Sequence, residues 1–147
     1  MLDISIKIKL DGFDELLKQI ERAGGTIEKA TDECIKRSAT IMEEELKAQM
    51  HKADVDSGLI NSMPAPSFEN EGNRYTARVG YKKGAYNPSN LSDGYKAVFL
   101  NYGTPKRKLH GQVKARGFIQ AAKKKAKPQI KRQQEQTLNE ILGGLNQ

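Results

Sequence analysis

The sequence predicts an α+β protein, in which a small, mainly antiparallel sheet packs against a long helix in the N-terminal half and a helix at the C-terminus. Apolar residues alternate with polar ones near the start of the chain and again near residue 75. Two long segments instead have apolar residues at three- and four-residue spacing. Strands flanked by helices, without regular alternation, indicate α+β architecture. The 147 residues are expected to form a single domain.

The first elements are expected to be a strand over residues 4–10 and a short helix. Isoleucine and leucine alternate with serine and lysine in this strand, which is the period of a sheet with one solvated face. Asp11 is expected to cap the helix that follows. The adjacent glycines Gly24 and Gly25 are expected to end it.

A long helix is predicted from Thr26, as its cap, to about Ala53, because apolar residues recur at helical spacing between them. Cys34, the single cysteine, lies on this apolar face and is expected to be a small buried residue. Residues 54–66 contain Gly58 and two prolines, so they are expected to form a turn with a short extended piece.

The second half is expected to contain two strands and a helix. Residues 74–82 are predicted to form a strand, residues 83–94 a turn-rich loop, and residues 96–102 a further strand. The last helix is predicted over residues 118–142, with a kink or break at Pro128 and an end at Gly143 and Gly144.

The charge is unevenly distributed along the chain. Residues 1–70 contain 9 Lys and Arg against 14 Asp and Glu, a net charge of −5, whereas residues 71–147 contain 16 against 4, a net charge of +12. Two interpretations stay open: a surface for nucleic-acid phosphates, or a basic face that meets the acidic region of a neighbouring subunit. No segment approaches the ~18 apolar residues that cross a membrane, so no membrane partner is expected and the protein is expected to be soluble and intracellular.

No residue pattern indicates catalysis. The two histidines, His51 and His110, lack partners at zinc-ligand spacing. The segment 54–57 begins like a calcium loop but lacks the later ligands, and the glutamates at 43–45 spread around a helix instead of pairing. Neither a nucleophile motif nor a phosphate-binding glycine loop is present. We therefore expect no enzyme activity, no metal and no cofactor.

The candidate interaction residues lie in two loops, at 83–96 and 106–114, and on the last helix. They are Lys83, Tyr86, Lys106, Arg107, Lys108, Lys114, Arg116, Lys123, Lys124, Lys127 and Lys131. Lysines four residues apart form one ridge of a helix, which is either a solvated face or a binding face. Tyr102 and Phe118 flank the second loop and are expected to pack inward, although exposed rings there would allow base stacking.

Three short motifs carry a resemblance to a known family. They are Asp56-Ser57-Gly58 with Ile60, Asn101-Tyr102-Gly103-Thr104, and Arg116-Gly117-Phe118-Ile119 with Ala121. Their order and spacing, over about two-thirds of the chain, resemble the minor tail component or neck (tail-completion) family of long-tailed bacteriophages. The family pattern has Thr in place of Ser57, often an acidic residue in place of Asn101, and often Pro in place of Gly117. It also places the aromatic-Gly-Thr motif at the end of a strand.

The resemblance implies a non-enzymatic subunit of a phage or prophage virion. Such a subunit joins the DNA-filled head to the tail, forms a ring around the DNA channel, and docks to head-closure and tail proteins, with non-specific DNA contact possible in the channel. It would be located in the virion, and in the bacterial cytoplasm during assembly. The alternative is a stand-alone basic nucleic-acid-binding module. A toxin-like nuclease is a weaker option, because no catalytic cluster is evident.

Overall fold

The computed structural model describes residues 5–71, 74–81, 92–104 and 114–147. The helices and strands, in chain order, are β1 (Ser5–Ile8), α1 (Asp14–Arg22), α2 (Ile27–Lys52), α3 (Ser57–Asn61), β2 (Ser67–Glu71), β3 (Arg74–Gly80), α4 (Asp93–Tyr102) and α5 (Phe118–Leu145). This arrangement confirms the predicted α+β class, with an antiparallel sheet, a long helix and a C-terminal helix that pack together.

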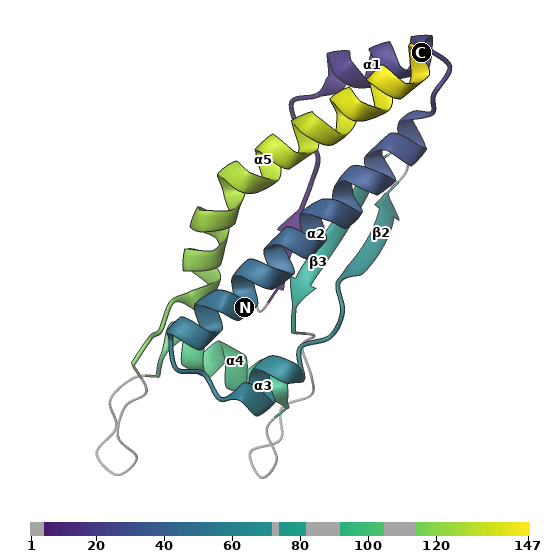
Figure 1. Ribbon diagram of the computed structural model, residues 1–147. Coiled ribbons are helices and arrows are strands. Elements are labelled where there is room, and N and C mark those ends of the chain that lie inside the picture. The colour runs from purple at the N-terminus through teal and green to yellow at the C-terminus, as the bar shows by residue number, and fades with distance from the viewer. Residues whose placement is uncertain (1–4, 72–73, 82–91, 105–113) are drawn as a thin grey trace, which may run out of the picture.

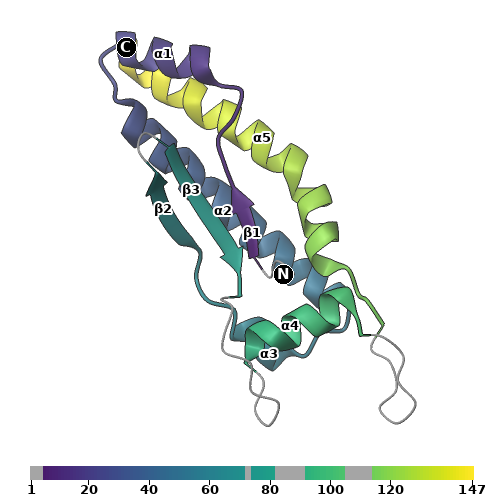
Figure 2. The same cartoon turned by 180° about the vertical axis from the view of Figure 1, so that it is seen from behind.

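The two long helices, α2 and α5, run side by side in opposite directions, and the sheet lies against α2 (Figure 1). α1 packs across the C-terminal end of α5, whereas α3 and α4 lie at the opposite end of the molecule. Figure 2 shows the other side, where none of the described helices covers the sheet and β1 lies next to α5. The sheet therefore has one face in the core and one face open.

The sheet has the strand order β1-β3-β2, and both outer strands are antiparallel to β3. Ile6 is opposite Val79, and Phe68 is opposite Ala77, which places these side chains on the face toward α2. Lys7 is opposite Arg78 on the open face. The alternation that predicted the first strand therefore divides β1 into the buried isoleucines Ile6 and Ile8 and the half-buried polar residues Ser5 and Lys7.

A buried polar cluster joins α2 to α5. Ser38 Oγ lies 2.8 Å from Gln133 Oε1 and accepts a hydrogen bond from Gln134 Nε2 at 3.1 Å. Gln134 Nε2 also donates to the carbonyl of Lys9 at 3.2 Å, just beyond β1. Since buried polar groups are stable only when hydrogen-bonded, this cluster fixes α5 against both α2 and the end of β1. Cys34 lies beside it and is buried, as predicted.

The predicted strand over residues 96–102 is wrong, because these residues belong to helix α4. Ser92 Oγ accepts a hydrogen bond from the backbone N–H of Tyr95 and caps the helix. The buried residues Gly94, Ala97 and Asn101 are spaced three and four apart, which is a helical pattern. The Val, Phe, Leu and Tyr residues between them favoured a strand by propensity alone, and tertiary packing overrides this preference.

Further differences concern the ends of elements and the middle of the chain. Asp11 does not cap α1, whose N-cap position is Phe13, without a side-chain hydrogen bond. Residues 54–66 contain the short helix α3, and strand β2 follows where no strand was predicted. α5 continues through Gly143 and Gly144 to Leu145. It also continues through Pro128, and its axis bends in the green part of the helix instead of breaking (Figure 1).

Candidate basic interface

A groove of about 420 Å³ lies between β1 and α5. β1 pairs with β3 alone among the described strands, so its other edge faces α5. The floor of the groove is apolar and is formed by Ile6, Ile8, Met42 and Ile130. Because β1 and α5 are at least 110 positions apart in the sequence, only the tertiary fold creates this groove.

Five lysines line the groove on both sides. Lys7 and Lys9 come from β1 and the residue that follows it, and Lys123, Lys127 and Lys131 come from α5. Ala122, Ala126 and Ile130 occupy the buried side of α5. Each of the three lysines directly follows one of these residues in the sequence, so the lysines lie beside the buried side of the helix and are exposed. We call these five residues and the apolar floor the basic groove.

Most of the charged residues that line the basic groove are positive. Among the described residues that line it, Asp11 is the only acidic one. Clustered lysines attract anions through their combined field, and their long alkyl stems can cover apolar surface while the ammonium groups stay solvated. The groove can therefore bind either a polyanion or an acidic protein segment whose apolar side chains reach the floor.

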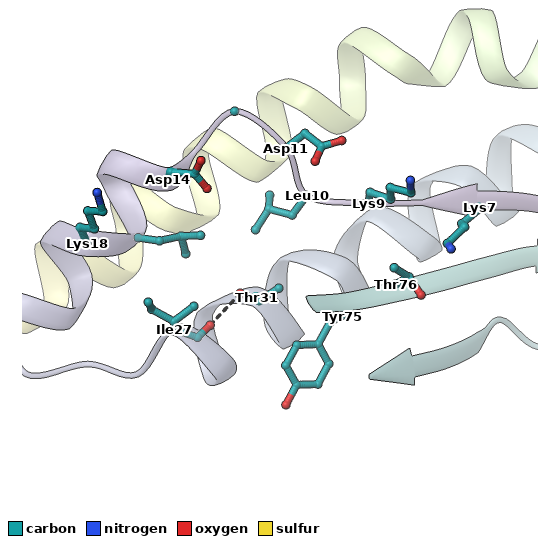
Figure 3. Close-up of a pocket in the computed structure, with 12 residues that line it drawn as sticks. Lys7, Lys9, Leu10, Asp11, Asp14, Lys18, Ile27, Thr31, Tyr75 and Thr76 are labelled. Atoms are coloured by element: carbon teal, nitrogen blue, oxygen red, sulfur yellow. Dashed lines mark hydrogen bonds between the residues drawn. The ribbon is translucent and has the colours of Figure 1, made fainter. Parts of the chain in front are cut away.

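A second pocket, of about 460 Å³, lies where β1, α1 and the start of α2 meet (Figure 3). Lys7 and Lys9 line it together with Lys18, but Asp11 and Asp14 also line it. The charges of both signs come from neighbouring segments, so this pocket is less suited to an anion than the basic groove is.

The other predicted interaction residues have varied positions. Lys124 is exposed on α5 but does not line the groove, and Lys114 is exposed before the helix begins. The predicted interaction residues that lie outside the described part of the chain are Lys83, Tyr86, Lys106, Arg107 and Lys108. Phe118 is buried, as expected, and Tyr102 is half-buried.

Arg116 is exposed to solvent, and its side chain also makes contacts that hold the fold together. Its guanidinium Nη1 donates to the carbonyl oxygens of Ala53, at 3.2 Å, and Asp54, at 3.0 Å. These carbonyls lie in the turn between α2 and α3, where Asp54 has a positive φ of 56°. Close by, Asp56 Oδ2 accepts a hydrogen bond from the N–H of Leu59 and caps α3. Arg116 therefore ties the start of α5 to the end of α2.

Asn101 makes the second connection at this end of the molecule. Its Oδ1 accepts a hydrogen bond from the backbone N–H of Ile119, at 2.9 Å, in the first turn of α5. The N-cap residue of α5 is Gly117, which has no side chain and has a φ of 60°. Asn101 thus satisfies one of the N–H groups that the helix leaves without a partner. The backbone N–H of Gly117 in turn donates to the carbonyl of Asn101 at 3.0 Å.

All three motifs that carry the family resemblance lie at the same end of the molecule, where α3, α4 and the start of α5 are found. The first motif caps α3, the second ends α4 and the third begins α5. We call the contacts of Asp56, Asn101, Arg116 and Gly117 the motif junction. Only the tertiary structure shows what these residues contact: Asn101 bonds to the start of α5, Arg116 bonds to the turn after α2, and Asp56 bonds within its own helix.

The sequence did not indicate that Lys7 and Lys9 belong to the same site as the lysines of α5. Their alternation with isoleucine gave the only available signal, because it placed both lysines on one face of the first strand. Which helix lies beside that strand depends on topology, and a strand-and-helix pattern along the chain does not contain this information.

Other candidate chemical groups have ordinary environments. Burial, and secondarily the charge of Glu33, raises the pKa of the Cys34 thiol to about 12, which keeps it protonated. His51 is exposed, and His110 lies outside the described residues. Within the described ranges, no group of three or more His, Cys, Asp or Glu residues is placed to hold a metal ion. The helices in these ranges include none that is long and apolar enough to cross a membrane.

Comparison of the chain with models of known protein families, with curated proteins and with solved structures finds no match in any of the three.

Proposed function

We propose that this chain is a structural protein of a phage or prophage virion, a neck or tail-completion subunit that joins head and tail by oligomerising and docking. It acts as a non-enzymatic component, in the virion and, during assembly, in the bacterial cytoplasm. The observation that carries the proposal is the motif junction. Of the three motifs that together resemble this phage family, the second and third hold the ends of α4 and α2 against the start of α5, and the first caps α3 at the same end of the molecule.

The motif junction supports the resemblance because it gives the motif residues a shared physical role. Asp56 caps one helix, and Asn101 caps another from 18 residues away. Gly117 adopts a left-handed backbone that favours glycine, and it links α4 to α5. Residues that form one junction are constrained together, so their joint presence at this spacing is more informative than three unrelated matches.

One part of the resemblance needs correction. The aromatic-Gly-Thr motif was expected at the end of a strand, and in this structure Tyr102 and Gly103 end helix α4. Gly103 has a φ of 80°, so it supplies a sharp exit from the helix. The motif therefore still marks the end of an element, but that element is a helix instead of a strand.

The surface charges support assembly with copies or partners. The basic groove places five lysines between β1 and α5, whereas residues 1–70 have a net charge of −5. A surface of this kind fits an acidic neighbouring subunit or head-side or tail-side protein, and it also fits DNA in a channel. Both occupants are compatible with a ring subunit.

Deletion of the gene in the phage or induced prophage that carries it tests the proposal. We expect electron microscopy to show DNA-filled heads and separate tails, with joining restored by the gene supplied on a plasmid. Normal numbers of complete, infectious particles after deletion would refute the function. We also expect portal, head-closure and tail-tube genes to lie next to this gene in the genome.

A second candidate function, that of a stand-alone nucleic-acid-binding module, is favoured by the basic groove alone. An isolated monomer that neutralises phosphates with lysines loses affinity steeply as salt increases. The double variant Lys127→Glu/Lys131→Glu should then abolish gel-shift binding of duplex DNA. The matched control is Lys124→Glu/Arg132→Glu, which makes the same charge change on the same helix with residues that do not line the groove. Equal binding by both variants would contradict a groove-based DNA site.

A further inference from the structure

Strand β2 has an outer edge that no described residue covers. Its inner edge pairs with β3, and the backbone of residues 67–70 has no other hydrogen bond in the described part of the chain. Both views place β2 on the side of the sheet away from α5 (Figures 1 and 2). The opposite edge differs, because Gln134 of α5 donates to the carbonyl of Lys9 beside β1. An uncovered edge is a template on which another strand can pair, so β2 is the edge that offers such a site.

An apolar row of side chains ends at this edge in an exposed ring. Ile8 lies opposite Ala77, which in turn lies opposite Phe68, so the three side chains cross the sheet on the face toward α2. Ile8 and Ala77 are buried, whereas Phe68 is 46% exposed because it is on the outermost strand. A strand added to β2 would cover this ring and remove apolar surface from water.

Opposite charges lie at the same edge on the other face of the sheet. Glu69 Oε1 is 3.9 Å from Arg78 Nε, and 50% and 40% of these two side chains remain exposed. Arg78 of β3 lies opposite Ser67, so only a small side chain separates it from the outer edge. Both charged groups therefore keep solvent-facing sides that an opposite charge from a second molecule can approach.

We infer that two copies of this chain pair along β2 in the antiparallel direction, with the two Phe68 side chains directly opposite each other. A two-fold axis perpendicular to the sheet relates the copies, so both α2 helices lie on the same face of the joined sheets. The joined sheet has six strands, three from each copy. This inference goes beyond the proposed function and does not depend on a role in a virion.

The side chains of β2 select this register. Pairing about Phe68 brings the two rings together and places Glu69 opposite Ser67 of the other copy. Pairing about Glu69 would put two carboxylates opposite each other, and pairing about Asn70 would put Glu69 opposite Glu71. Like charges directly opposite are destabilising, whereas paired aromatic rings are stabilising. A shift by one residue would place Phe68 opposite Glu69, which mixes the apolar and charged faces.

The same register alternates the charges across the contact. In the row that crosses both sheets, Arg78 of one copy is followed by Ser67 and then by Glu69 of the other copy. Each Glu69 therefore lies between the Arg78 of its own copy and that of the second copy. Two carboxylates and two guanidinium groups then form one network, and a network contributes more than isolated surface pairs do.

The contact is isologous, because both copies use the same edge. One contact covers the β2 edges of both copies, so the association stops at a dimer. β1 forms the opposite edge of each sheet, and the basic groove lies beside it. The dimer therefore presents two basic grooves, one on each outer side, to partners of another kind.

Exchange of the two charges tests the contact in solution. Glu69→Arg leaves only positive groups in the network and Arg78→Glu leaves only negative ones, whereas a mixed pair restores opposite charges. Light scattering at low salt should show a dimer for the unmodified chain, a monomer for each variant alone, and a dimer for their equimolar mixture. Rescue in the mixture also shows that both variants fold.

The matched control is Glu135→Arg, which makes the same charge change at an exposed position of α5, away from β2, and should remain a dimer. A monomeric unmodified chain, or a mixture of the two β2–β3 variants that stays monomeric, would overturn the inference. Phe68→Ser should weaken the dimer at least about tenfold. Leu145→Ser, which removes another exposed apolar side chain, should not weaken it, and equal effects would contradict a contact through Phe68.

Disulfide trapping tests the register. Differently tagged Ser67→Cys and Glu69→Cys chains should form a mixed disulfide, since directly opposite Cα atoms are about 4.5–5.5 Å apart and a disulfide needs less than about 7 Å. Cys34 is buried and is the chain's only native cysteine, so it can remain. Self-disulfides of the exposed Lys124→Cys variant give the background. A mixed yield at that background, or Glu69→Cys joined to itself as the main product, would overturn the pairing about Phe68.

Discussion

Asn101 should be one of the most sensitive polar residues of the fold. It is 1% exposed, and its Oδ1 accepts the N–H of Ile119 at 2.9 Å. In Asn101→Ala this N–H group stays buried and loses its partner, which costs about 1–3 kcal/mol. The Nδ2 of Asn101 has no hydrogen-bond partner in the structure, so no second bond is lost. We therefore expect a loss of about 2 kcal/mol in the free energy of unfolding.

Urea unfolding, followed by circular dichroism at 222 nm, measures this loss. With an m-value of about 2 kcal/mol/M, the midpoint should decrease by roughly 1 M. Asn139→Ala is the matched control, because Asn139 is exposed on α5 and the same substitution there should change stability by less than about 0.5 kcal/mol. Asn101→Asp keeps an acceptor at the N-terminus of α5 and should lose less than Asn101→Ala. An Asn101→Ala midpoint equal to that of Asn139→Ala would refute the capping role.

Three further expectations concern buried side chains. Phe118→Ala should lower the free energy of unfolding by about 3–5 kcal/mol in the same urea assay, because the ring is 1% exposed and its removal leaves a cavity; a loss below about 1 kcal/mol would contradict its place in the core. The Cys34 thiol should react with a thiol reagent at pH 8 at least a hundredfold more slowly in the folded protein than in urea, and equal rates would show that it is accessible. Burial raises the pKa of Cys34 to about 12 from an ordinary value near 9, so between these pH values the folded state holds a proton that the unfolded state releases. The contribution of this thiol to the free energy of unfolding should therefore be complete below about pH 9 and should decrease between pH 9 and 12. The decrease should be smaller in Cys34→Ala, and identical pH profiles for the two proteins would contradict this reasoning.

Periodicity predicted most of the secondary structure because it reports which residues are buried. The isoleucines of β1, the apolar positions of α2 and the alanines of α5 occupy the buried positions that their spacing implied. The wrong prediction of a strand at α4 shows the limit of β-strand propensity. Its buried positions are Gly94, Ala97 and Asn101, which carry little apolar signal, while the more hydrophobic residues between them are only half-buried.

The candidate site was predictable only in part. The lysine ridge of α5 follows from four-residue spacing, and its exposure agrees with that prediction. The contribution of Lys7 and Lys9 depends on β1 lying beside α5, which is set by sheet order and by the hydrogen bond from Gln134 to Lys9. Strand β2 escaped prediction because its five residues, SFENE, contain a single apolar side chain and thus no alternation.

Mass spectrometry of purified virus particles tests the central claim most directly. The phage or prophage that we propose as the source of this gene is grown or induced, and its particles are separated from host proteins by density. We predict that the protein is present in a fixed copy number per particle, and that a tag on it is located where head meets tail. Complete particles that contain no copy of the protein would contradict its role as a virion subunit.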